Sequence, residues 1–103
     1  MYKIEYLPLA AQDLVDIAAY ISQKLCNPQA AEALANLLIK EIDNLSSFPY
    51  IHELYISSYP LKHEYRKLTV KNYLVFYWID EAKKLVTISR VLYGKRDYNT
   101  LLK

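Results

Sequence analysis

The spacing of apolar residues changes once along this chain, and the change limits which elements each half can form. Up to about residue 49, apolar side chains recur every three or four residues, which is the period of an amphipathic helix. From about residue 63, they alternate or run continuously in short segments rich in Val, Ile and Tyr, which is typical of strands. The sequence therefore predicts helices mainly in the first half and a sheet mainly in the second.

Two helices are expected before residue 49. The first covers residues 8–25, where the apolar residues form one stripe and Pro8 suits the first turn. The second covers residues 28–46, with Asn27 as its N-cap and Pro28 in its first turn. Because the connection is so short, the two helices should be antiparallel neighbours.

Four strands are expected around these helices. An alternating segment at residues 2–6 comes first, and after a Tyr-rich loop at 50–62 the others cover residues 63–70, 73–79 and 85–93. The segment at 73–79 is apolar on both faces, which predicts a central strand. The three C-terminal strands should form an antiparallel meander because their connections are short.

Two turn positions carry local information. Lys71-Asn72 separates two strand segments and predicts a tight hairpin. Gly94, the only glycine, follows the last strand and predicts a backbone position with positive φ.

These elements predict an α+β fold in the order β-α-α-β-β-β. The N-terminal strand and the antiparallel helical hairpin should pack on one face of a twisted antiparallel sheet, because the helical stripes have nothing else to bury against. A chain of 103 residues suits one domain, so residues 1–103 are expected to form a single unit.

Several classes of protein are disfavoured. Cys26 is the only cysteine, so neither an internal disulfide nor a cysteine-based metal site is expected, and His52 and His63 have no cysteine near them. No nucleotide-binding glycine loop, HExxH or GxSxG motif occurs, and no cofactor is expected. The N-terminus lacks the apolar run of a signal peptide, and no segment has the ~20 apolar residues of a membrane span, which predicts a cytoplasmic protein.

Charge is unevenly distributed along the chain. Residues 1–50 hold three Lys and six Asp or Glu, a net charge of −3, whereas residues 51–103 hold ten Lys or Arg and five Asp or Glu, a net charge of +5. The second half is therefore the candidate anion-binding half.

Basic and tyrosine residues interleave in this second half. The basic members are Arg66, Lys67, Lys71, Arg90, Lys95 and Arg96, and the tyrosines are Tyr65, Tyr73, Tyr77, Tyr93 and Tyr98. If they project together from the sheet face that the helices leave uncovered, the cations can contact phosphates and the tyrosines can stack on bases. Alternatives stay open: Tyr73 and Tyr77 also suit the core, and Arg90, inside an apolar strand, equally suits an acidic partner.

Such residues can cleave RNA without a metal. The 2′-OH attacks the neighbouring phosphate, so the site needs a proton acceptor, a proton donor and cations that stabilise the pentavalent phosphate. A binding surface that does no chemistry has the same composition.

Segments in both halves resemble the RelE/ParE toxins of bacterial type II toxin–antitoxin systems. The N-terminal segments are residues 11–21, Asn27-Pro28-Gln29-Ala30-Ala31 and Phe48-Pro49, and the C-terminal segments are residues 65–70, 72–77 and 88–98. The resemblance covers nearly the whole chain in order. It implies a helical hairpin on a twisted antiparallel sheet and a cognate antitoxin, with which the toxin forms a hetero-oligomer.

The two branches of this superfamily differ in their targets. RelE-like members enter the ribosome and cut mRNA, whereas ParE-like members inhibit DNA gyrase and are not nucleases. The first hypothesis is a ribosome-dependent, metal-independent mRNA endoribonuclease. The second is a ParE-like gyrase inhibitor, which the long N-terminal helical hairpin favours. The third is a degenerate toxin that only binds its antitoxin.

The nuclease hypothesis assigns roles to particular residues by resemblance. Arg66 and Arg96 would contact the phosphate, and Tyr98 would take part in proton transfer. The remaining RNA-binding candidates are Lys67, Lys71, Arg90, Tyr93 and Lys95. One position departs from the nuclease pattern: Leu74 stands directly after the Tyr that opens a strand, where the nuclease branch often has an Arg.

Overall fold

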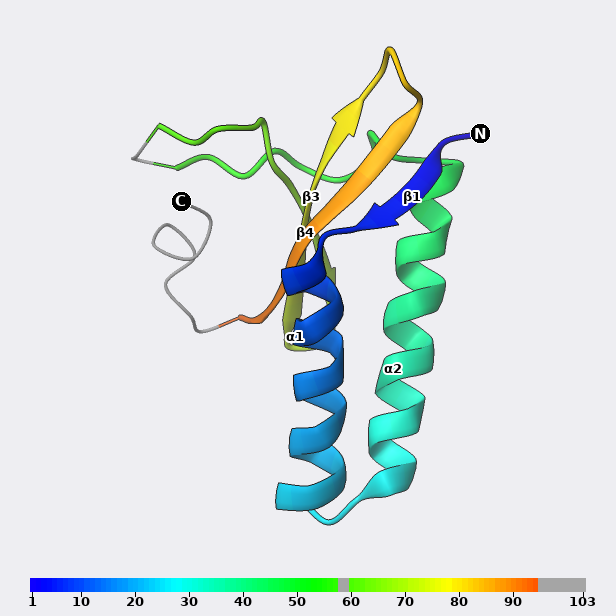
Figure 1. Ribbon diagram of the computed structural model, residues 1–103, viewed down its shortest axis with the longest axis vertical. Coiled ribbons are helices and arrows are strands. Elements are labelled where there is room, and N and C mark those ends of the chain that lie inside the picture. Colours follow the sequence, from blue (N-terminus) through cyan, green and yellow to red (C-terminus); the bar gives the residue numbers. More distant parts are fainter. Residues whose placement is uncertain (58–59, 95–103) are drawn as a thin grey trace.

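The computed structural model of the chain describes residues 1–57 and 60–94 (Figure 1). The elements follow the expected order, with two short helical turns added. They are β1 (Lys3–Tyr6), α1 (Pro8–Ala19), a π-helical turn (Tyr20–Lys24), α2 (Pro28–Asp43), a 3₁₀ turn (Asn44–Ser46), β2 (Arg66–Val70), β3 (Tyr73–Asp80) and β4 (Leu85–Tyr93). None of the helices in these ranges is long and apolar enough to cross a membrane.

The helical hairpin forms as the sequence predicts. The π-helical turn carries the first helix nearly to the expected end, where the Leu25 amide donates to the Tyr20 carbonyl at 3.2 Å. Asn27 caps α2, because its side-chain oxygen accepts a hydrogen bond from the Ala30 amide at 3.1 Å. Helices α1 and α2 lie side by side on one face of the sheet (Figure 1).

The sheet has the strand order β1-β4-β3-β2, with β3 inside it as predicted. Strands β2, β3 and β4 pair antiparallel, but β1 pairs with β4 in parallel, so the sheet is mixed and not antiparallel throughout. Short turns force successive strands to run antiparallel. No such local rule sets the direction of β1, which is far from β4 in the sequence.

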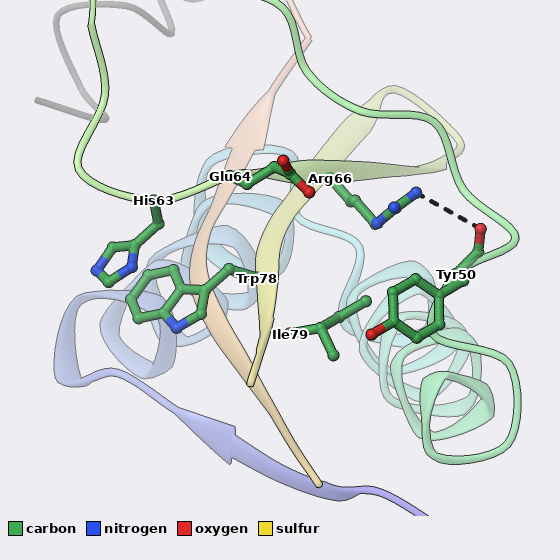
Figure 2. A pocket seen from close by; sticks show the side chains of 6 residues that line it. All are labelled: Tyr50, His63, Glu64, Arg66, Trp78 and Ile79. Atoms are coloured by element: carbon green, nitrogen blue, oxygen red, sulfur yellow. Dashed lines mark hydrogen bonds between the residues drawn. The ribbon is translucent and has the colours of Figure 1, made fainter. Parts of the chain in front are cut away.

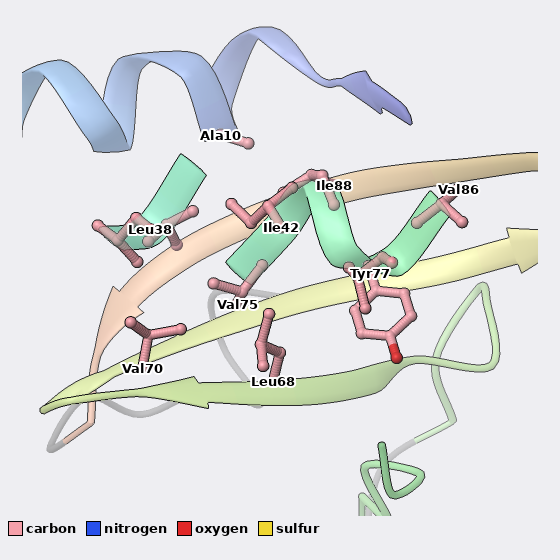
Figure 3. Close-up of a cluster of buried hydrophobic side chains, with 11 residues drawn as sticks. Ala10, Leu38, Ile42, Leu68, Val70, Val75, Tyr77, Val86 and Ile88 are labelled. Carbon is pink, nitrogen blue, oxygen red and sulfur yellow. The ribbon is translucent and has the colours of Figure 1, made fainter. Parts of the chain in front are cut away.

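Both faces of the sheet bury apolar side chains. Toward the helices, side chains of the sheet such as Leu68, Val75 and Tyr77 pack against Leu38 and Ile42 of α2 (Figure 3). A second cluster contains the buried residues Tyr65, Phe76 and Leu92, with Tyr55, Leu61, Leu74 and Trp78 packed against them. The loop that contributes Tyr55 and Leu61 therefore covers part of the face that the helices leave open.

The tight turn at Lys71-Asn72 is present, but the expectation for Gly94 is wrong. Gly94 does not have positive φ; in the described ranges that conformation belongs to Cys26, Lys71 and Lys84, with φ of 51°, 55° and 50°. The Gly94 amide donates to the Asn72 carbonyl at 2.8 Å. Gly94 thus extends the pairing beyond β4 and has no need of a left-handed conformation.

Helix α1 closes the edge of β4 where β1 ends. Strand β1 pairs with β4 only as far as Ile88. Beyond that point the Asp13 carboxylate accepts a hydrogen bond from the Val91 amide at 2.9 Å. It also accepts hydrogen bonds from Nε and Nη2 of Arg90 at 2.8 and 2.9 Å. The Arg90 and Asp13 side chains are only 16% and 12% exposed, so this ion pair is largely shielded from water.

A second polar cluster holds the N-terminus against the β3–β4 turn. The Tyr2 hydroxyl lies 2.7 and 2.9 Å from the two carboxylate oxygens of Glu81, the Tyr50 hydroxyl donates to Glu81 at 2.9 Å, and Lys84 forms an ion pair with Glu81. Hydrogen bonds from Lys84, Tyr2 and Tyr50 lower the pKa of Glu81 from 4.5 to about 2. These contacts join β1, the β3–β4 turn and the segment after the helices.

We expect Asp13→Ala to lower the free energy of unfolding by about 2–4 kcal/mol. The substitution leaves the Arg90 guanidinium and the Val91 amide without their hydrogen-bond acceptor in a place shielded from water. Urea denaturation measures this loss. Asp16→Ala is the control: Asp16 is on the same helix but exposed, and its replacement should change stability by less than about 0.5 kcal/mol. Equal losses in the two variants would contradict this role for Asp13.

We expect Glu81→Gln to make thermal stability less dependent on acid. The folded-state pKa of Glu81 is depressed, so its contribution is present above its ordinary pKa of 4.5 and is lost as the pH falls toward about 2. The difference in Tm between wild type and Glu81→Gln should therefore be full at pH 7 and vanish across that window. Glu5→Gln, at an exposed position on β1, should show no such pH-dependent difference.

Candidate functional site

The basic candidates in the described strands do not share one face of the sheet. Side chains alternate along a strand, so the neighbours Arg66 and Lys67 must point to opposite faces. Arg66 shares its face with Leu68 and Val70, which belong to the helix-side core. The expectation that the cations project together from the uncovered face is therefore wrong for Arg66.

Arg66 anchors the segment that follows the helices. Its Nη1 donates to the His52 carbonyl at 2.8 Å and lies 3.5 Å from the Tyr50 carbonyl, and its guanidinium carbon is 5.1 Å from the centre of the Tyr50 ring. The hydroxyl of Tyr77 donates to the Pro49 carbonyl at 2.7 Å in the same region. Burial raises the pKa of Tyr77 to about 12, and the nearby charge of Arg66 opposes that rise.

A hollow of about 150 Å³ lies beside Arg66 at the edge of the sheet (Figure 2). Its lining residues are Tyr50, His63, Glu64, Arg66, Trp78 and Ile79. His63 stacks flat on Trp78, with ring centres 3.7 Å apart and an interplanar angle of 6°. One cation, one carboxylate and several rings suit a small polar or aromatic group better than a chain of phosphates.

The two basic candidates on the opposite face are already engaged. Lys67 forms a surface ion pair at 3.5 Å with the largely exposed Glu53 carboxylate, whereas Arg90 is bound by Asp13 in a shielded place. Arg90 therefore has the acidic partner that was one of its two sequence-based interpretations. Leu74 lies on this face in the apolar cluster with Phe76 and Leu92.

Lys71 and Tyr93 lie at the other end of the strands. They line a second hollow, of about 270 Å³, with Thr69, Asn72, Tyr73, Leu74 and Gly94. The rings of Tyr73 and Tyr93 meet edge to face at 5.8 Å, and burial raises the pKa of Tyr73. Lys95, Arg96 and Tyr98, the remaining candidates, lie outside the described residues.

The sequence also left important residues unassigned. Asp13 and Glu81 organise the two polar clusters, yet no local pattern separates Asp13 from Asp16, one turn further along the same helix. Within the described ranges, no group of three or more His, Cys, Asp or Glu side chains gathers in a way that could hold a metal ion.

Comparisons with known proteins connect this fold to one family. The family model described as "ParE toxin of type II toxin-antitoxin system, parDE" matches residues 4–98. A search of curated protein sequences finds no match.

Solved structures with the same fold come from toxin–antitoxin systems. The chromosomal ParDE system of P. aeruginosa matches with a TM-score of 0.74 and 18% identity, over 92% of this chain and 98% of that chain. The RelBE2 complex of Mycobacterium tuberculosis gives 0.63 and 18%, over 89% and 96%. The intact E. coli RelBE complex gives 0.60 and 14%, over 93% and 100%.

The structural likeness supports the α+β fold, and the family model spans nearly all of the sequence with its helical hairpin and its sheet. The chain therefore belongs to the ParE toxin family of type II toxin–antitoxin systems.

Proposed function

We propose that this toxin acts as ParE-like proteins do, by binding and inhibiting DNA gyrase, and that it does not cut RNA. The observation that carries this proposal is the sheet face opposite the helices. That face is filled by Leu74, Phe76, Trp78 and Leu92, and the loop bearing Tyr55 and Leu61 packs against it. An apolar, partly covered face is poorly suited to a chain of phosphates.

Electrostatics point the same way. A metal-free ribonuclease has to stabilise a pentavalent phosphate with preorganised cations, and losing one such donor typically costs about 10²–10³-fold in rate. Lys67 and Arg90 are paired with carboxylates, and Leu74 stands where the nuclease branch often has an Arg. A toxin that works by protein contact needs none of these cations free.

The alternative is a RelE-like mRNA endoribonuclease that works on the ribosome. One observation supports this alternative. Arg66 borders a hollow, and among the described residues only its Nη1 donates to protein carbonyls, so the rest of its guanidinium could contact a phosphate. Arg66 would then act with Arg96 and Tyr98. The third possibility, a degenerate toxin, predicts no growth arrest at all.

We also propose a cognate antitoxin that forms a hetero-oligomer with this chain. The matched solved structures include toxin–antitoxin complexes. Large apolar side chains are exposed along the helical hairpin, namely Leu9, Val15, Tyr20, Leu25 and Ile39. Exposed apolar residues of this kind fit the apolar face of an amphipathic partner helix.

The target is tested by two assays on the purified chain. We expect inhibition of gyrase supercoiling at stoichiometric toxin and no cleavage of mRNA in a reconstituted translation reaction. Arg66→Ala and Arg96→Ala should leave the mRNA result unchanged, because there is no cleavage to lose. Codon-dependent cleavage that falls by about 10²-fold or more in Arg96→Ala, with gyrase unaffected, would overturn the gyrase proposal.

The partner is tested with the protein encoded by the short reading frame beside the toxin gene. We expect the two proteins to co-purify. Expression of the second protein together with the toxin should relieve the growth arrest that the toxin causes alone. Val15→Asp puts a charge on the exposed hairpin surface and should weaken the complex at least about tenfold in calorimetric titration. Lys83→Asp, in the β3–β4 turn, is the control, and the absence of any complex with the wild-type chain would refute this partner.

A further inference from the structure

Three residues other than glycine have positive φ in the described ranges, and each lies in a turn or just after a helical turn. This conformation costs a residue with a Cβ free energy. Cys26 follows the end of a helical turn, where left-handed residues are common, and its Sγ is 3.5 Å from the Gln23 carbonyl. Lys84 is bound by Glu81, and its ammonium lies 5.0 Å from the centre of the Tyr2 ring.

Lys71 differs from the other two in the surroundings of its side chain. It is the first residue of the two-residue β2–β3 turn and has φ of 55°, whereas the second, Asn72, is not among the residues with positive φ. Positive φ at the first position alone is the pattern of a type II′ turn, where glycine is preferred. Among the residues that the structure describes, the Lys71 ammonium has no carboxylate partner and no hydrogen bond.

The surroundings of Lys71 have the character of a binding site. Its side chain borders the hollow of about 270 Å³ at the end of the sheet. Tyr73, Leu74 and Tyr93 provide apolar walls, and Thr69 and Asn72 provide polar groups at the rim. Tyr93 is 42% exposed even though it is a large aromatic residue.

We propose that the hollow around Lys71 binds a segment of a partner protein in which an acidic residue stands beside an apolar or aromatic one. The carboxylate would pair with the Lys71 ammonium, and the apolar side chain would lie against Tyr73 and Tyr93. This proposal does not depend on whether the toxin acts on gyrase or on mRNA, because it is based only on the groups around the β2–β3 turn.

A peptide fits these groups better than a nucleic acid does. Nucleic acids bind through several phosphate contacts, and Lys71 is the only Lys or Arg among the described residues lining this hollow. Stacking also needs an open ring face, whereas Tyr73 and Tyr93 meet edge to face with an interplanar angle of 73°.

The test is an NMR titration of the isotope-labelled full chain with N-acetyl-Asp-Phe-amide. We expect saturable shifts of the amides of residues 71–74 and 93–94 in the millimolar range. N-acetyl-Asn-Phe-amide, which lacks the charge, should bind about threefold more weakly, as expected for one exposed ion pair. Lys71→Arg should keep this preference for Asp, and Lys83→Ala, which removes a cation from the other end of β3, should not change the titration.

Lys71→Gly separates binding from folding. Glycine relieves the turn, so the Tm should rise by several degrees while the preference for the Asp peptide disappears. Three results would overturn the proposal: no saturable shift at this end of the sheet, equal binding of the Asp and Asn peptides, or unchanged binding by Lys71→Gly. Tighter binding of a short oligothymidylate to the same amides would also overturn it, in favour of a nucleic-acid site.

Discussion

Strand β3 carries apolar side chains on both of its faces, and the rest of the described fold is arranged to bury them. Val75 and Tyr77 are fully buried on the helix side, and Phe76 is fully buried on the other. Strands β2 and β4 pair with its two edges, and the helical hairpin covers one face. On the other face, Tyr55 and Leu61 extend the cover from a loop, which leaves less of the sheet open than a single-sided fold would.

Polar contacts then hold in place the parts that apolar packing leaves undetermined. Asp13 ties α1 to the stretch of β4 that β1 does not reach, and Glu81 ties the N-terminus to the β3–β4 turn. Arg66 binds the carbonyls of the segment between the helices and the sheet. Arg66 and Arg90, two of the basic residues that the sequence suggests as ligand-binding candidates, thus make contacts within the fold, so basic composition alone is a weak guide to an RNA-binding surface.

The fold by itself does not distinguish a gyrase inhibitor from an mRNA endoribonuclease, because ParDE and RelBE structures share it. We base the proposed gyrase inhibition on the side chains of the sheet face opposite the helices. In this chain that face is largely apolar, and its two basic candidates, Lys67 and Arg90, have carboxylate partners.

Local rules predicted most of the fold from the sequence. Periodicity located both helices and all four strands, Asn27 and Pro28 marked the start of α2, and the unbroken apolar run identified β3 as a central strand. Each of these signals depends only on residues close together in the chain, so no knowledge of distant contacts was required. The family resemblance also came from the sequence, because it rests on the order of short segments.

Only the tertiary structure decided the direction of β1, the partners of the charged residues and the face on which each basic side chain lies. β1 and β4 are some eighty residues apart in sequence, and so are Asp13 and Arg90; no local pattern couples them. The bulge in β4 next to Tyr77 shifts the alternation of side chains, so the face of Arg90 follows from its pairing with β3. Elements form from near neighbours, whereas a site forms from residues that only folding brings together.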